Sequence, residues 1–270
     1  MAFNLPFMAL GTVNALFLLH QRMINSVGLW DDELADMDRV GTVTILMPTL
    51  NEADLVERAL ASLRDQNVLV AYPDRFEIVV VDSDSTDGTA EIAKRLADKV
   101  ITAPLGKLTS IDTALQEIKS DIIIAVDGDS FYNVNFANLL LRHFEDPKVV
   151  GVSGVELYEG SLPAIWSLVN ENYFFSVKPR LMGRGSAYRR AAYFSTGGFN
   201  LDIDQKDLGQ MVLEEEFGFW NRLSAIGKCL RETRASVITA PRRLGCSGCA
   251  YDEDAPHCVF CEQVHAGERF

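Results

Sequence analysis

The chain has 270 residues, which fits one large domain or one domain with appendages, because single hydrophobic cores stop growing near about 250 to 300 residues. Hydrophobic residues make up 48% and charged residues 23%, so the composition argues against a fibrous or disordered chain. With 25 Lys and Arg against 38 Asp and Glu, the formal charge is −13; the chain repels phosphate backbones, and nucleic acid is not an expected partner.

Residues 1–24 are mostly apolar, and an acidic stretch follows them. The apolar stretch is barely long enough to span a bilayer core of about 30 Å, and it lacks the basic start and cleavage site of a signal peptide. Two alternatives stay open: a helix that contacts a membrane, and a helix that packs on the protein itself. We interpret residues 31–38 as a solvated acidic linker, so residues 1–40 are expected to form an appendage.

From residue 42 the pattern alternates between apolar strands and amphipathic helices. Strands are predicted over residues 42–47, 76–81, 100–102 and 122–126. Helices are predicted between them, after residue 52, over residues 90–97 and over residues 110–119. Strands without polar alternation, separated by helices, are typical of a parallel sheet with helices on both faces. Ligands of such sheets bind beyond the carboxyl ends of the strands.

The second half of the chain has a less regular pattern. Helices are predicted over residues 135–145, 162–177 and 213–226, and strands over residues 149–155 and 236–239. The Gly-rich residues 183–187 are predicted to form a flexible loop, and Gly197-Gly198 a turn. The helix over residues 162–177 is rich in aromatic side chains, which suit either the core or a surface that faces an acceptor or lipid.

Two carboxylates follow the strand predicted over residues 122–126. Asp127 and Asp129 are two residues apart, so on an extended chain both side chains point to the same side. Two hard oxygen donors beside a diphosphate form a natural site for Mg²⁺ or Mn²⁺. Taken alone the motif is weak evidence, because Asp-Gly-Asp is also common in turns.

Polar clusters also end the first two predicted strands, and the three clusters together resemble the family 2 glycosyltransferases with the GT-A fold. Thr44–Glu52, Val80–Thr89 and Ile124–Asp129 match the family's pattern in order and spacing. The resemblance implies a GT-A domain over residues 41–245, with a mostly parallel central sheet and helices on both faces. It also implies a nucleotide-diphosphate sugar of the UDP or GDP type as donor.

The same resemblance implies roles for single residues. The positions that would hold the nucleotide sugar are Pro48, Thr49, Asn51, Glu52, Asp82 and Lys107. Carboxylates there can accept from an imide N–H or from ribose hydroxyls, although helix capping and turn formation are alternatives. Lys107 falls where the family often has a basic residue, and a solvated surface lysine is the alternative. Asp127 would face the ribose or the metal, and Asp129 would bind Mg²⁺ or Mn²⁺.

Glu215 and Glu216 stand where the family usually has Glu-Asp, six or seven residues before Arg222. The second position serves as general base in the family, so Glu216 is the candidate base and Glu215 its neighbour or substitute. The alternative is that these glutamates favour the N-terminus of a helix. Arg242 and Arg243 resemble the family's late basic segment and would clamp the diphosphate with forked donors, with surface salt bridges as the alternative.

Four of the five cysteines form two Cys-x-x-Cys motifs near the end of the sequence: Cys246, Cys249, Cys258 and Cys261. Four thiolates at this spacing suit a tetrahedral, structural Zn²⁺, with disulfides or free thiols as alternatives. We therefore expect residues 246–270 to form a small zinc-binding lobe outside the family's common core.

These observations predict a metal-dependent, inverting glycosyltransferase that moves one sugar to an acceptor hydroxyl or lipid phosphate, in the cytoplasm or at the cytoplasmic face of a membrane. A nucleotidyltransferase is a rival interpretation, but it should show a Gly-rich basic loop after the first strand, and residues 48–52 contain none. The other rival is a catalytically idle GT-A domain that binds a partner through its zinc lobe.

Overall fold

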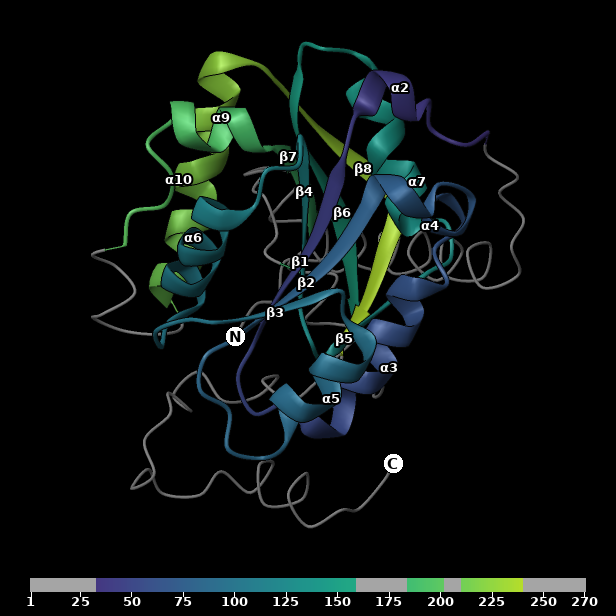
Figure 1. Cartoon of the computed structure of the whole chain (residues 1–270). Helices are drawn as coiled ribbons and strands as arrows, with labels where there is room; N and C mark the ends of the chain where they lie inside the picture. Colours follow the sequence, from purple (N-terminus) through teal and green to yellow (C-terminus); the bar gives the residue numbers. More distant parts are fainter. Residues whose placement is uncertain (1–32, 159–183, 202–209, 240–270) are drawn as a thin grey trace, which may run out of the picture.

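The structure is a computed structural model that describes residues 33–158, 184–201 and 210–239 (Figure 1). Three predicted segments lie outside the described residues: the apolar residues 1–24, the helix over residues 162–177 and the Cys-rich tail over residues 246–270.

Within the described residues, eight strands form one sheet in the order β3-β2-β1-β4-β7-β6-β8-β5. The strands are β1 (Val43–Thr49), β2 (Phe76–Asp82), β3 (Lys99–Thr102), β4 (Ile122–Val126), β5 (Ser130–Tyr132), β6 (Val149–Tyr158), β7 (Gly185–Arg189) and β8 (Lys228–Thr239). The half built from β3, β2, β1 and β4 is parallel, as the alternating pattern predicts. The strand predictions in this half are correct to within two residues at each end.

The sheet as a whole is mixed, so the prediction of a mostly parallel sheet needs correction. Strand β7 runs antiparallel to both β4 and β6, and β5 runs antiparallel to β8. Residues 183–187 were predicted as a flexible loop, but residues 185–189 form β7 because they fill the gap between two buried strands. Strand pairing and burial here outweigh the low intrinsic strand preference of glycine and serine.

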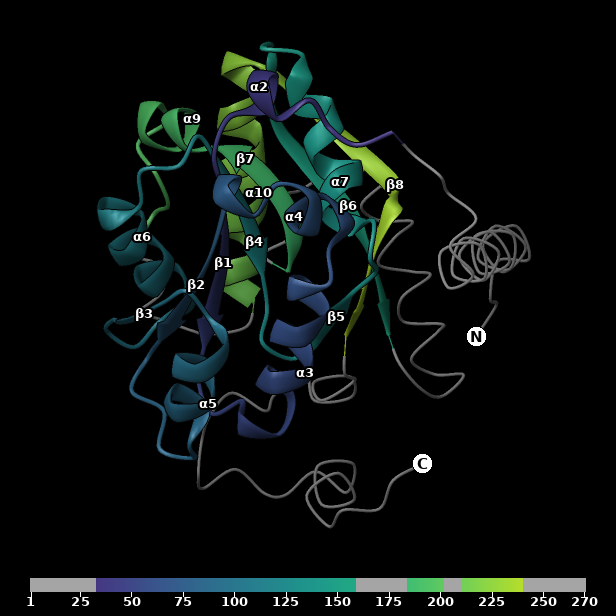
Figure 2. The ribbon, with the colours of Figure 1, turned by 45° about the vertical axis from the view of Figure 1, so that its right-hand side comes forward.

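Helices cover both faces of the sheet (Figures 1 and 2). One face holds α3 (Ala53–Arg64), α4 (Asn67–Ala71), α5 (Thr89–Leu96) and α7 (Phe136–Leu141), and the other holds α6 (Lys107–Glu117), α9 (Arg190–Ser195) and α10 (Gln210–Ile226). Alternate residues of one strand serve the two faces: Ile45 packs in the first core and Leu46 in the second. The described residues also contain two short turns of 3-10 helix, η1 (Pro73–Arg75) and η2 (Arg142–Glu145).

The acidic stretch before β1 packs on the domain from residue 33 onward. The short helix α2 (Met37–Val40) buries Met37 and Val40, while the acidic side chains around it are exposed. The Ala35 N–H donates to Asn138 Oδ1 at 2.8 Å, and the Asn138 amide donates to the Glu33 carbonyl at 3.2 Å. This segment therefore combines a solvated acidic surface with a fixed attachment to α7.

Candidate active site

The carboxyl ends of β1, β2, β4, β6 and β8 meet at one edge of the sheet, where β5 and β7 begin. Thr49 lies opposite Asp82 in the register of β1 and β2, and Val126 lies opposite Gly185 in that of β4 and β7. Ser130 lies opposite Thr239, the last described residue of β8. The sheet thus collects the polar residues that follow several strands.

Asp82 lies at the base of this edge and is 4% exposed. Its carboxylate accepts from the Thr49 hydroxyl at 3.4 Å and from the Ser85 N–H at 3.0 Å. The Ser83 N–H donates to the Thr49 carbonyl at 3.0 Å, which extends the pairing of β1 and β2 by one residue. Asp82 therefore connects the end of β1 to the loop after β2, and it is also one of the residues predicted to contact the nucleotide sugar. Pro48, half-buried, lies opposite Val81 one residue earlier.

Asn51 holds the loop after β2 against the loop after β1. Its backbone is in the left-handed region, with φ 53°, a conformation that Asn tolerates better than most residues. Its N–H donates to Ser85 Oγ at 2.9 Å, and its side-chain oxygen accepts from the Thr86 N–H at 2.9 Å. The side chain predicted to contact a nucleotide therefore also organises the loop.

The start of α3 is capped by side chains of the same loop after β2. The Glu52 N–H donates to Thr89 Oγ1 at 2.7 Å, and the Ala53 N–H donates to Asp87 Oδ2 at 2.9 Å. Slight burial alone would raise the pKa of Asp87, but hydrogen bonds from Thr89 and Ala53 outweigh it and lower that pKa. The Glu52 side chain forms no cap of its own helix.

Asp127 receives two cations. Lys107 Nζ, at the start of α6, lies 2.8 and 3.1 Å from its two carboxylate oxygens, and Arg184 Nε lies 3.7 Å from Oδ2. Lys107 is therefore an ion-pair partner within the site and not an isolated surface lysine. The Asp127 N–H donates to the Tyr132 hydroxyl at 2.8 Å, so the backbone of this residue is fixed too.

Gly128 brings the loop after β4 against the loop after β1. A Cβ at this position would lie 3.1 Å from Thr49 Cγ2 and 3.4 Å from Glu52 Cγ, so a larger residue would press on both. Asp129 Oδ1 accepts from Ser130 Oγ at 3.1 Å and from Thr239 Oγ1 at 3.4 Å. The contacts through Thr49 thus link the loops that carry Asp82, Asp127 and Asp129.

The donor chemistry suits a cation that is shared with a phosphate. Within residues 33–158, 184–201 and 210–239, no three His, Cys, Asp or Glu side chains gather into a cage for a metal ion. Asp127 and Asp129 offer hard carboxylate oxygens at one edge. Mg²⁺ and similar cations commonly use one or two carboxylates and complete their shell with water and substrate phosphate oxygens. The residues present therefore fit such an ion.

The two predicted glutamates of α10 have different surroundings. Glu215 is 4% exposed, and its Oε1 accepts from Arg222 Nη2 and, at 2.9 Å, from the Asn200 N–H. Arg222 also donates to the Gly198 carbonyl at 2.9 Å. Glu215 thus ties the predicted glycine turn to α10. Glu216 is buried next to it, on a different side of the helix.

Several residues of this edge were not predicted from the sequence: Tyr132, Glu156, Arg184 and Thr239. Glu156 lies in β6 and is 1% exposed, and Arg184 Nη1 lies 2.6 Å from its Oε1. A charged residue inside an apolar strand was the available signal for Glu156. Arg242, Arg243 and the four cysteines of the predicted zinc lobe lie outside the described residues.

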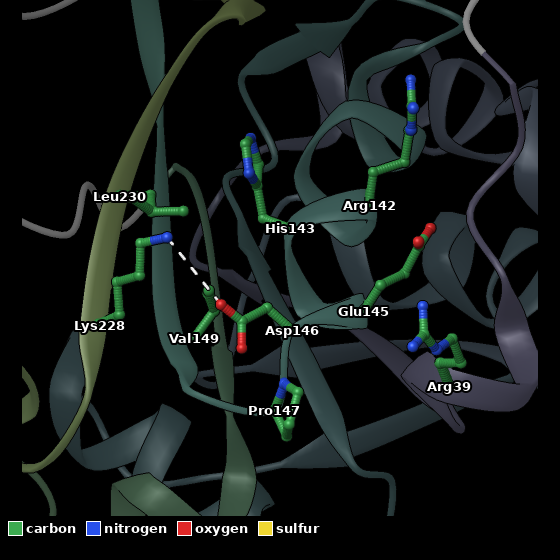
Figure 3. Close-up of a pocket in the computed structure, with 9 residues that line it drawn as sticks. All are labelled: Arg39, Arg142, His143, Glu145, Asp146, Pro147, Val149, Lys228 and Leu230. Atoms are coloured by element: carbon green, nitrogen blue, oxygen red, sulfur yellow. Dashed lines mark ion pairs between the residues drawn. The ribbon is translucent and has the colours of Figure 1, made fainter.

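A surface groove of about 500 Å³ lies at the opposite edge of the sheet (Figure 3). Val149 and Lys228, which begin β6 and β8, line it together with Arg142 and His143. The strands β6 and β8 are parallel, so their first residues lie at one edge of the sheet and their last residues at the other. Asp82, Asp127 and Asp129 lie at the edge where strands end, so this groove is separate from the candidate site.

The sequence matches a profile described as "Glycosyl transferase family 2" over residues 44–199. Among curated relatives, the poly-beta-1,6-N-acetyl-D-glucosamine synthase of Staphylococcus aureus (strain MSSA476) is 25% identical over 126 residues, covering 44% of this chain and 29% of that protein. Glycosyltransferase AglJ of Haloferax volcanii is 30% identical over 115 residues, covering 42% of this chain and 34% of that protein. The matched region spans about a third of the length of these relatives.

Solved structures share the fold. A mannosyltransferase from Pyrobaculum calidifontis, PcManGT, in complex with GDP-Man and Mn²⁺ has a TM-score of 0.60 and 23% identity, covering 88% of this chain and 69% of that chain. GalNAc-T7 with UDP, GalNAc and Mn²⁺ has a TM-score of 0.58 and 16% identity, covering 78% of this chain and 45% of that chain. For the membrane question, no helix among the described residues has the length and apolarity of a membrane span.

Proposed function

The chain belongs to glycosyl transferase family 2 and has a GT-A-like fold, and from this premise we propose that it transfers one sugar from a nucleotide-diphosphate sugar to an acceptor, with inversion and with a divalent metal. The observation that carries the proposal is the shared edge of the sheet. There Thr49 touches Asp82 and approaches Gly128, which lies between Asp127 and Asp129. Three acidic loops can thus face one donor.

The nucleotide half of the donor would lie over the loops after β1 and β2. Glu52 and Asp82 would accept from the base or the ribose hydroxyls, and Pro48, Thr49 and Asn51 would shape the surface beneath them. The solved structures with GDP-Man or with UDP support a donor of this class. Arg242 and Arg243 would add forked donors to the diphosphate.

A Mg²⁺ or Mn²⁺ ion would be held by Asp129, with Asp127 beside it. When bound, it supplies charge neutralisation to the diphosphate that leaves. The Mn²⁺ in two solved structures of this fold supports the choice of ion. Hydrogen bonds from Ser130 and Thr239 orient the Asp129 carboxylate for this role.

The acceptor oxygen would attack the anomeric carbon from the face opposite the diphosphate. A new C–O bond forms while the bond to the diphosphate breaks, and Glu216 takes the proton of an acceptor hydroxyl. Glu216 stands at the position that serves as base in the family, while the neighbouring Glu215 accepts from Arg222 and from the Asn200 N–H. A phosphate acceptor would need no base. A lipid-linked acceptor would suit membrane contact by residues 1–24, at a cytoplasmic membrane face.

The test is an assay of sugar release or transfer from UDP- and GDP-sugars with Mn²⁺. We expect Asp129→Ala to lower kcat by about 10² to 10³-fold, the range seen when one charge-stabilising group is lost. Unchanged turnover in this variant would reject the metal assignment. Absence of turnover and of donor binding in the wild-type chain would favour the idle domain that binds a partner.

The cysteine motifs support a separate proposal of one structural Zn²⁺ on Cys246, Cys249, Cys258 and Cys261. Protein purified without added zinc should contain about one zinc per chain by elemental analysis. A value near zero would reject the site.

A further inference from the structure

An ion pair with a buried carboxylate lies next to Asp127. Glu156 is 1% exposed in β6, and Arg184, which directly precedes β7, places Nη1 2.6 Å from its Oε1. The sequence motifs of the family assign neither residue. The pair joins two neighbouring strands at the edge that carries Asp127.

The ion pair is an inefficient way to stabilise a core. Burial removes the Glu156 carboxylate from water, while the Arg184 side chain stays 30% exposed; well-packed apolar residues in place of a buried charge and its partner are often as stabilising or more so. Val237, which lies opposite Glu156 on β8, is a buried apolar residue of the kind that would fill this place. The pair is therefore better explained by what it holds in position.

Arg184 is fixed at three points. Its guanidinium contacts Glu156, its carbonyl accepts from the Tyr132 hydroxyl at 3.1 Å, and the next residue, Gly185, pairs with Val126 in the sheet.

The fixed guanidinium faces Asp127. Arg184 Nε lies 3.7 Å from Asp127 Oδ2, while Lys107 contacts the same carboxylate from α6. The same Tyr132 hydroxyl that holds Arg184 accepts from the Asp127 N–H. Asp127 and Arg184 are thus connected twice, by their backbones through the Tyr132 hydroxyl and by their side chains directly. A displacement of Arg184 should therefore displace Asp127.

We propose that Arg184, held by Glu156, is a positioning residue for Asp127, and that it sets the carboxylate geometry on which binding of a metal–nucleoside diphosphate complex depends. This inference rests on the proposed function. Lys107 supplies charge to Asp127 but is a flexible point charge, whereas the planar guanidinium contacts Glu156 and Asp127 at once.

The experiment measures binding of Mn²⁺ with GDP and with UDP by electron paramagnetic resonance, which reports bound Mn²⁺ without turnover. Three variants are compared with the wild-type chain: Arg184→Gln, Arg184→Lys and Glu156→Gln. Arg234→Gln is the matched control, because Arg234 is exposed to a similar extent and pairs with another buried glutamate, Glu232.

We expect Arg184→Gln and Glu156→Gln to weaken Mn²⁺–nucleotide binding about tenfold. Arg184→Lys should weaken Mn²⁺–nucleotide binding about threefold, because an ammonium keeps the positive charge but cannot contact two carboxylates with the planar set of N–H donors of a guanidinium. If Arg184→Gln does not fold, Arg184→Lys is the variant to compare with the wild-type chain. Arg234→Gln should bind like the wild-type chain, with a lower melting temperature at most.

Wild-type binding by both Arg184 variants would overturn the positioning role alone and leave the proposed function intact. Equal weakening by Arg234→Gln would also overturn it, because the effect would then be general destabilisation. If the wild-type chain binds neither GDP nor UDP with Mn²⁺, the proposed function and this inference fall together.

Discussion

Two neighbouring glutamates of α10 illustrate how much depends on single side chains. Their position before Arg222 can be predicted from the sequence, but the partner of each cannot. Glu215 reaches Arg222 and the backbone of Asn200, contacts made by residues 7 and 15 positions away in the chain. Successive helix residues point about 100° apart, so Glu216 has other surroundings. The structure therefore shows Glu215 as a link between α10 and the turn at Gly198, and the role of Glu216 as base stays a prediction.

Glutamine variants of Glu215 and Glu216 should affect different quantities, the stability of the fold and the rate of catalysis. Glu216→Gln should lower kcat about 10² to 10⁴-fold, the usual contribution of a general base. Glu215→Gln should lower the free energy of unfolding by about 2 kcal/mol, because it removes the charge from a buried hydrogen bond to Arg222. Kinetics and urea unfolding on the same preparations would check both. A kcat loss confined to Glu215→Gln would reverse the assignment.

At the scale of elements, β8 combines regular pairing with an irregular middle. Arg231 pairs with Ser153 and Ser236 with Val155, so residues 232–235 bulge out of the ladder with β6. Gly154 is needed opposite the bulge, since a Cβ there would lie 2.5 Å from the Ala235 carbonyl oxygen. The bulge places Glu232 between Arg234 and His143 of η2.

The bulge makes stability depend on pH. Burial alone would raise the pKa of Glu232, but hydrogen bonds with His143 and Arg234 outweigh it and lower the pKa from 4.5 to about 2. A lowered folded-state pKa means that the stabilisation is complete above pH 4.5 and is lost as the pH falls through about 2. The shift corresponds to about 3 kcal/mol. Urea unfolding from pH 5 to pH 2.5 should show this loss in the wild-type chain relative to Glu232→Gln. Parallel pH profiles of the two proteins would contradict it.

The elements that the sequence predicts well are those with a local signal. The strands and helices from β1 to β4 repeat apolar residues at fixed spacing, and the structure confirms each of them. Strands β5 and β7 were missed for two reasons. The first has three residues, too few for a period, and its partner Ile238 lies far along the chain. The second is rich in glycine and serine and becomes a strand only between β4 and β6.

At the scale of the whole molecule, the candidate site has two kinds of residues: those in short contiguous motifs, and those that come from distant parts of the sequence. The acidic loops after β1, β2 and β4 are contiguous motifs, which is why they could be predicted. The supporting contacts are not contiguous: Glu156 and Arg184 are 28 residues apart, and Tyr132 and Arg184 are 52 apart. Only the mixed sheet brings them together, and the mixed sheet was not predicted.

Ligand binding should stabilise the whole chain. A nucleoside diphosphate with Mn²⁺ at one hundred times its Kd adds about 2.7 kcal/mol to the free energy of unfolding. For a domain of this size that is a rise of roughly 5 to 10 °C in Tm, measured by thermal shift. The nucleoside without phosphates should give a smaller rise, because it lacks the groups that the metal and the cations bind. Equal rises for both would argue against a diphosphate site.

Strand β5 begins next to Asp129 and pairs with β8, although 110 residues separate Asp129 from Thr239. On the ribosome, the nascent polypeptide therefore presents its acidic loops long before the codons for residues 228–239 have been translated. The edge that carries the candidate site reaches its final form only after that late segment has left the exit tunnel.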